Sequence, residues 1–228
     1  MTNLDVYICT DRRLPDELLE EARQRAIQEN PENYPKSLTA TEPLHLALLT
    51  GTKWKNGRTL RVTFLDGHPT VKQRVIKYAK VWEEYANIKF QFGNFPNAEI
   101  RISFKQEGSW SYLGTDNLSI PKNQPTMNYG WLRPNTPESQ YHVVYHEFGH
   151  ALGCIHEHQN PAGGIQWNKE AAYRYYGRQG WSRAMVDQQV FNKYSVNHTQ
   201  FTEIDPTSIM MYPVPKELTL NGFEAGNN

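Results

Sequence analysis

Residues 146–156 carry the pattern that most constrains this chain, His146-Glu147-x-x-His150-x-x-Gly153-x-x-His156. On a helix, His146 and His150 are four residues apart and project from one face, so both imidazoles can bind one ion. Glu147 lies about 100° around the helix from His146 and is better placed to reach a metal-bound water than to bind the metal itself. The spacing therefore predicts a helix that carries a metal site.

Glycine at position 153 allows the chain to turn back after that helix, because glycine can adopt a positive φ. This turn would bring His156 to the ion as a third ligand. Three protein ligands leave one position of a tetrahedral Zn²⁺ open, which is typical of a catalytic site. The plain alternative is a helix with two surface histidines and a glycine cap. Chance would produce the whole pattern in only on the order of 10⁻⁵ to 10⁻⁴ of chains this long, so we favour the zinc site.

A second motif lies further along the chain, Ser208-Ile-Met210-Met-Tyr212 followed by proline. With it, the chain resembles the metzincin metalloendopeptidases, and among them the astacin family most closely. The closer likeness comes from His156-Glu157-His158 at the end of the zinc motif and from the form of the second motif, which corresponds to the Met-turn of that family. The segment Gly108–Gly114 also resembles the astacin segment near the substrate-binding edge strand. The resemblance covers roughly residues 58–213.

This resemblance implies roles for three more residues. Met210 would pack beneath the zinc, and Tyr212 would place a phenol near the metal, as a ligand at rest and an oxyanion donor during reaction. Glu157 matches a family glutamate that interacts with the buried amino terminus of the matured enzyme. The alternatives are core packing of an apolar turn for Met210 and Tyr212, and a solvated or locally paired carboxylate for Glu157.

Hydrophobic periodicity predicts an α+β fold of the zincin type, with a twisted mixed sheet, backing helices, the metal-bearing helix and a small, mostly helical C-terminal subdomain. Thr136 is a suitable N-cap for the metal-bearing helix, and Pro137 suits its first position. His142 lies one turn before His146 but is left out of the ligand set, because three successive imidazoles on one helix cannot surround a tetrahedral ion. The expected strands lie within residues 60–64, 88–92 and 100–104, and the other expected helices span residues 15–29, 69–85, 168–176 and 182–194.

We expect an N-terminal extension over residues 1–57, which the helix at 15–29 makes similar to a prosegment. The catalytic domain would cover residues 58–228, with an upper subdomain over 58–153 and a lower one over 154–228. The short stretch after Tyr212 indicates either a truncated chain or a minimal closing subdomain.

Charge and composition exclude several partners. The 24 basic and 24 acidic residues balance, which argues against nucleic acid as a partner. No apolar run approaches about 18 residues, and the start lacks an apolar signal region, so neither a membrane span nor a classical secretion signal is expected. We expect a monomer that is cytoplasmic or leaves the cell by a non-classical route.

Two cysteines, Cys9 and Cys154, are too few for a disulfide framework. Cys9 has two interpretations. Its thiolate could fold across the site and occupy the open zinc position, as in other metzincin zymogens, or it could be a small buried hydrophobic residue. Cys154, inside the motif, is expected to pack beneath the site.

The expected function is a zinc-dependent metalloendopeptidase, with one Zn²⁺ on His146, His150 and His156. Glu147 would be the general base, and Tyr212 would stabilise the oxyanion. The substrate would be an extended protein or peptide segment paired with an edge strand within residues 109–120. A different class, a catalytically silent zinc-stabilised interaction module, has no need of a carboxylate at Glu147. Zinc-dependent hydrolysis of a non-peptide ester is the third interpretation.

Overall fold

The computed structural model describes residues 9–34, 48–49, 51–194 and 199–226. The chain divides into two compact units. The first consists of Met1–Pro35 and Gly51–Gly153, and the second of Lys36–Thr50 and Cys154–Asn228. Residues 1–8, which were expected to lack a signal region, lie outside the described residues.

The first unit is built on a five-stranded mixed sheet in the order β3-β2-β4-β6-β5. Four strands run parallel, and β5 pairs antiparallel with β6 at one edge. Because apolar residues alternate along β2, Leu60 and Val62 both point into the core and are fully buried. The strands span Thr59–Phe64 (β2), Lys89–Phe92 (β3), Ile100–Ser103 (β4), Ser109–Ser111 (β5) and Met127–Tyr129 (β6). The predicted mixed-sheet α+β fold is confirmed.

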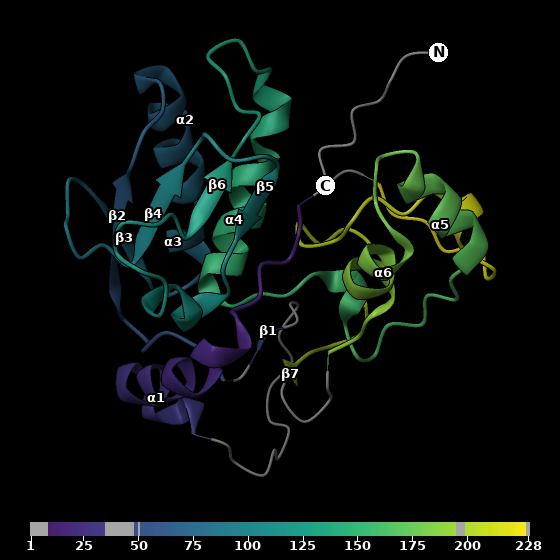
Figure 1. Ribbon diagram of the computed structural model, residues 1–228, viewed down its shortest axis with the longest axis horizontal. Helices are drawn as coiled ribbons and strands as arrows, with labels where there is room; N and C mark the ends of the chain where they lie inside the picture. Colours follow the sequence, from purple (N-terminus) through teal and green to yellow (C-terminus); the bar gives the residue numbers. More distant parts are fainter. Residues whose placement is uncertain (1–8, 35–47, 50, 195–198, 227–228) are drawn as a thin grey trace. The chain divides into compact units, whose positions relative to one another are not determined.

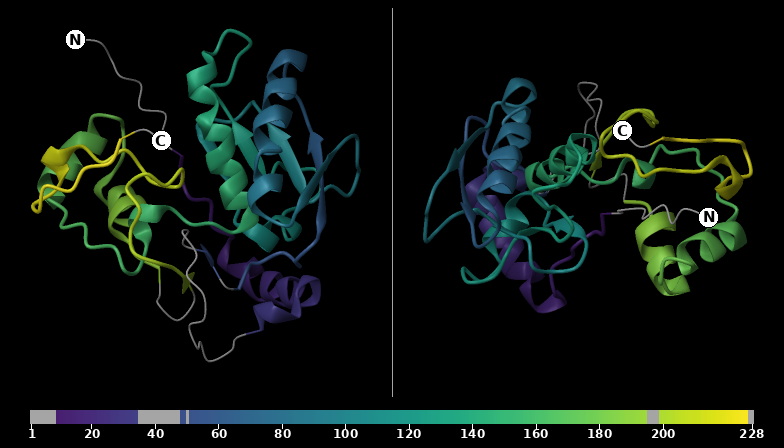
Figure 2. Two further views of the ribbon diagram at one scale, coloured as in Figure 1. Left: turned by 180° about the vertical axis from the view of Figure 1, so that it is seen from behind. Right: turned by 90° about the horizontal axis from the view of Figure 1, so that it is seen from above.

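Helices α2 and α4 lie side by side on one face of this sheet (Figures 1 and 2). Helix α2, Pro69–Ala79, begins with a His68 side chain that accepts a hydrogen bond from the Thr70 N–H. The prediction of one helix from residue 69 to 85 is wrong, because the chain tightens after Ala79 and begins a short helix α3, Trp82–Tyr85. Trp82 is buried and its indole Nε1 donates to the Tyr145 carbonyl at 2.9 Å, whereas Tyr85 is 79% exposed and contributes nothing to the expected stripe.

The start of α4, His142–Leu152, also differs from the prediction. Thr136 does not cap this helix, since its hydroxyl accepts from the Arg133 N–H at 2.8 Å. A 3₁₀ turn over Glu138–Tyr141 intervenes. His142, excluded as a ligand, has its Nδ1 2.8 Å from the Ser139 carbonyl.

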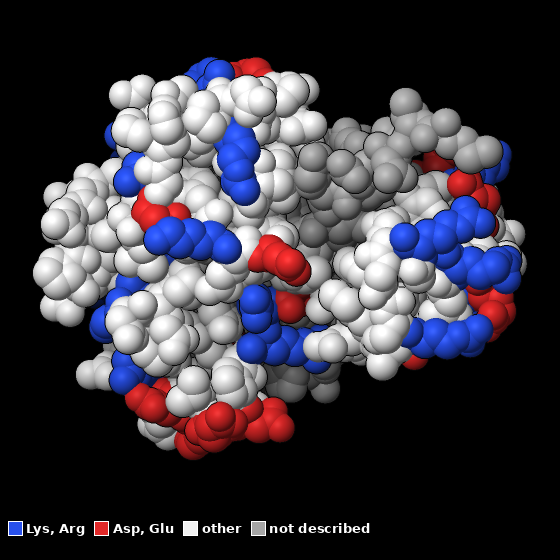
Figure 3. All heavy atoms as spheres, turned by 45° about the horizontal axis from the view of Figure 1, so that its top comes forward, with Lys and Arg blue, Asp and Glu red and all other residues white. Residues whose placement is uncertain are grey.

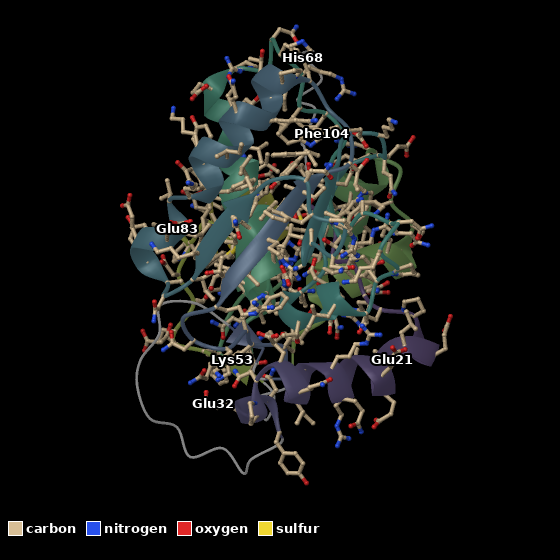
Figure 4. All side chains as sticks on the ribbon, turned by 90° about the vertical axis from the view of Figure 1, so that its left-hand side faces the viewer. Glu21, Glu32, Lys53, His68, Glu83 and Phe104 are labelled. Carbon is tan, nitrogen blue, oxygen red and sulfur yellow. The ribbon has the colours of Figure 1, made fainter. Side chains whose placement is uncertain are left out.

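Residues 9–34 belong to the first unit. A 3₁₀ turn, Asp16–Leu18, leads into helix α1, Leu19–Glu29, which together cover the predicted helix. Leu14 and Ala22 pack against Ile120 in one apolar cluster. The main chain at Lys53 is tied to the turn after α1, where Asn33 Oδ1 accepts its N–H at 3.0 Å; Figure 4 shows Lys53 close to Glu32.

The second unit contains helix α5, Lys169–Gly177, and helix α6, Arg183–Val186. Strands β1, Leu48–Leu49, and β7, Thr199–Gln200, form a two-stranded antiparallel sheet. The helix predicted over residues 182–194 was too long and too regular. It continues from α6 as a π-helical turn, Asp187–Phe191, and then becomes extended at Asn192.

None of the described helices is both long enough and apolar enough to span a membrane. On the face drawn in Figure 3, basic and acidic side chains are interspersed rather than gathered into one basic field.

Candidate metal centre

Two predicted ligands lie on α4 in the first unit. His146 and His150 are both buried, and their Nε2 atoms lie 3.1 Å apart. Two nitrogens bound to one tetrahedral zinc at about 2.0–2.1 Å would be separated by roughly 3.3 Å. The helix therefore holds the two rings at the spacing that a shared ion needs.

Gly153 ends α4 with a φ of 104°, a left-handed conformation that favours glycine. Its N–H donates to the His150 carbonyl at 2.8 Å. His156 follows three residues later and is fully buried. Ligand atoms of His146, His150, His156 and Cys9 all lie within 4.8 Å of one another. Three imidazole nitrogens and a thiol are typical zinc donors, so these residues fit a zinc ion.

The Cys9 thiol reaches this group from the N-terminal segment. Cys9 is 6% exposed, and its Sγ donates to Glu147 Oε2 at 3.4 Å. Its main chain forms a parallel bridge with Ser109 on β5, where the Thr10 N–H donates to the Ser109 carbonyl at 3.2 Å. Burial raises the pKa of Cys9, and the neighbouring Glu147 and Asp11 carboxylates raise it further. Of the two interpretations of Cys9, the structure favours the one that places its sulfur among the metal ligands.

Glu147 is fully buried on α4 beside these ligands. Burial raises the pKa of its carboxyl group well above the usual range, the charge of Asp11 adds to this, and the hydrogen bond from Cys9 opposes it. A carboxylate in this position faces the metal-binding group without itself belonging to it. That is the arrangement the sequence predicted for a base.

In the second unit, the Met-turn lies against the segment that carries His156. Met210 is fully buried, and its carbonyl accepts the Glu157 N–H at 2.9 Å. The Tyr212 ring is 2% exposed and lies 4.4 Å from the His156 ring, centroid to centroid, at 62°. The structure therefore brings Tyr212 into contact with a predicted ligand.

Glu157 is held locally. Its Oε1 accepts from the Asn160 side chain at 2.9 Å and from the Asp205 N–H at 3.3 Å. Asn160 also donates to the Thr202 carbonyl at 3.1 Å. These bonds connect the residues after His156 to the chain that leads into the Met-turn.

Cys154 is buried, and burial raises the pKa of its thiol to about 12. A thiol in this environment packs as a small apolar group. This agrees with the packed residue that its place in the motif suggested.

Sequence reasoning missed three residues that hold the metal-bearing segments. The Trp54 indole donates to the Ala151 carbonyl at 2.7 Å, near the end of α4, and Trp82 donates to the Tyr145 carbonyl. His158 donates from Nε2 to the Gln189 carbonyl at 2.8 Å. Nothing in the sequence marks the tryptophans as partners of α4, but the His156-Glu157-His158 triplet is a signal that could have drawn attention to His158.

Comparison with known proteins yields consistent relatives. Serralysin B of Dickeya chrysanthemi is 30% identical over 150 residues, which make up 58% of this chain and 30% of that protein, so the chain spans under a third of this relative. One solved structure of myroilysin is 46% identical, with a TM-score of 0.78 over 80% of this chain and 90% of that one. A second myroilysin structure is 39% identical, with a TM-score of 0.63 over 99% of this chain and 85% of that one.

The model of the Astacin peptidase family matches residues 49–216, which is most of the chain. This match contains the zinc motif and the Met-turn, the two features on which the predicted resemblance rests. The resemblance is confirmed, and the chain belongs to the astacin family of zinc metalloendopeptidases.

Proposed function

We propose that this astacin-family peptidase cleaves internal peptide bonds, with zinc held by His146, His150 and His156 and with Glu147 as the general base. The observation that carries the proposal is the buried Glu147 carboxylate on α4, one residue after His146 and beside the group of ligand atoms. When bound, zinc supplies Lewis acidity, which lets water act as a nucleophile near neutral pH and polarises a carbonyl group.

Glu147 moves the proton in this scheme. Its carboxylate accepts a proton from the water whose oxygen attacks the scissile carbonyl carbon. The same group returns that proton to the amine nitrogen as the C–N bond breaks. The products are one new carboxyl group and one new amine, and Glu147 is regenerated.

Tyr212 stabilises the developing oxyanion by donating a hydrogen bond from its phenol. Its ring contact with His156 supports this role, because it places the side chain beside a metal ligand. Met210 and Gly153 support the site through packing and through the turn after α4.

An extended peptide substrate binds along β5. This strand pairs with β6 on one side only. Its other side accepts an extended chain, since Thr10 donates to the Ser109 carbonyl and the Arg12 guanidinium lies 4.4 Å from the Trp110 ring centre. Main-chain pairing of this kind supplies affinity with little dependence on sequence.

The same contacts imply that residues 9–12 restrain activity in the described form. They occupy the edge that a substrate needs, and the Cys9 sulfur occupies the fourth ligand position of the zinc. Departure of this segment then precedes catalysis.

Removing the metal tests the function. We expect one zinc per chain by metal analysis, loss of peptide cleavage on chelation and its return with added zinc. Profiling against a peptide library, with and without chelator, would show cleavage at internal bonds. A His156→Ala variant should lose bound zinc, because two protein ligands remain where catalytic sites use three. Cleavage that persists in metal-free protein would contradict the proposal.

Replacing Cys9 with alanine is expected to raise the activity of the full chain by about tenfold or more, because a ligand on the same chain competes at high effective concentration. Initial rates on one library-derived peptide measure this. Cys154→Ala is the matched control and should give no gain. A thiol reagent should modify Cys9 faster after chelation than before. Equal activity of Cys9→Ala and wild type would rule out the restraint.

A further inference from the structure

We propose that His158 is a positioning residue that orients the phenol of Tyr212 from the side of the second unit. The proposal rests on the function assigned above to Tyr212, and it adds a residue that acts through that tyrosine. His158 comes two residues after His156 in the chain. Its own contacts, rather than its place in the motif, assign the role.

The His158 ring is held at one nitrogen. His158 is 1% exposed, and its Nε2 lies 2.8 Å from the Gln189 carbonyl oxygen. A carbonyl oxygen can only accept, so Nε2 carries the hydrogen. This bond sets the direction of the ring plane.

The acceptor comes from an unusual turn. Asp187–Phe191 is π-helical, and the Asn192 N–H closes it by donating to the Asp187 carbonyl at 2.9 Å. Widened turns of this kind release carbonyl groups from the regular ladder and occur often at functional sites. Here the Gln159 amide donates to the carbonyls of Gln188 and Gln189 at 3.2 and 3.3 Å, beside His158. The turn is thus a fixed platform for the two residues that follow Glu157.

The held ring of His158 packs against Tyr212. The two ring centroids lie 4.2 Å apart at 33°, a tilted stacking contact, while the His156 ring meets Tyr212 at 4.4 Å and 62°. A tyrosine side chain has two torsions, and close contacts with two rings leave it few rotamers. The contact with His156 comes with the metal site. The contact with His158 is an added restraint, fixed by the π-helical turn.

A double-mutant cycle separates positioning from general stability. We expect His158→Leu to lower kcat by about tenfold with KM nearly unchanged, because a loosened phenol is misplaced only for the oxyanion. In the Tyr212→Phe background the same substitution should change kcat less than about twofold, since no phenol remains to position. His158→Phe keeps a ring against Tyr212 but loses the donor, so it should fall between His158→Leu and wild type.

Two readouts do not depend on activity. Zinc content should remain at one per chain in His158→Leu, and a crystal structure of that variant should show the Tyr212 ring displaced. Tyr173→Phe is the matched control. It removes a 2.6 Å hydrogen bond to Asp187 at the start of the same turn without touching Tyr212, and it should leave kcat unchanged.

Three results would overturn the proposal. These are an equal kcat loss in both backgrounds, loss of zinc from His158→Leu, and an unmoved Tyr212 ring in that variant. A Tyr212→Phe single variant with wild-type kcat would instead overturn the role of Tyr212 itself, so the two failures are distinguishable. If His158→Leu does not fold, His158→Phe provides the same cycle and the same crystal structure.

Discussion

Replacing Glu147 with glutamine is expected to lower kcat by about 10²–10⁴-fold while zinc and the fold are retained. The amide has nearly the shape of the carboxylate, which matters because Glu147 is fully buried, but it cannot accept the proton of the attacking water. The comparison is best made in Cys9→Ala protein, since the Cys9 thiol is hydrogen-bonded to Glu147 in the described form. The measurements are kcat on a library-derived peptide and zinc content.

Glu138→Gln is the control for this experiment. Glu138 lies in the turn just before α4, where it accepts from Lys77 and Tyr78 at the surface. Its replacement should leave kcat unchanged. If Glu147→Gln kept more than roughly a tenth of the activity, Glu147 would not be the base. The alternative of a silent interaction module makes the opposite forecast, in which wild type and variant are equally inactive.

Replacing Tyr212 with phenylalanine is expected to lower kcat by about 10²–10³-fold with little change in KM, because the lost hydrogen bond forms only with the developing oxyanion. The ring contacts with His156 and His158 are kept by phenylalanine, and the three histidines retain the zinc. Steady-state kinetics and metal analysis on the same samples measure both quantities.

Tyr176→Phe is the matched control, since Tyr176 is another fully buried tyrosine of the second unit and stacks on Trp181. Its replacement should not alter kcat. A raised KM with unaltered kcat in Tyr212→Phe would make Tyr212 a substrate-binding residue. No change in either constant would return Met210 and Tyr212 to ordinary core packing.

The metal-bearing helix could be predicted because zinc chemistry needs particular side chains at set spacings. His146 and His150 must share one helix face, and a turn at Gly153 must precede His156, so the letters alone imply the local structure. The α+β class could be predicted as well, because alternation at Leu60 and Val62 marks a half-buried strand. Both features depend on short stretches of chain.

What could not be predicted depends on distant partners. No local pattern ends α2 at Ala79, and the break allows the Trp82 indole to reach the Tyr145 carbonyl. The π-helical turn at Asp187–Phe191 looks like an ordinary helix in sequence, and its carbonyls matter only because His158 and Gln159 lie beside them. The position of Cys9 depends on pairing with Ser109, 100 residues further along the chain. Long-range contacts of this kind leave little trace in periodicity.

Residues 9 and 10 also protect the sheet from self-association. The opposite edge strand, β3, carries exposed Lys89 and Gln91, the polar guard that natural edge strands use. β5 has no such guard, because Ser109, Trp110 and Ser111 are all buried. Once the N-terminal residues leave, its open N–H and C=O groups can pair with any extended chain, including a second enzyme molecule. A copy captured in this way lies where substrates lie, so crowding of the uncovered enzyme would feed self-digestion before aggregation.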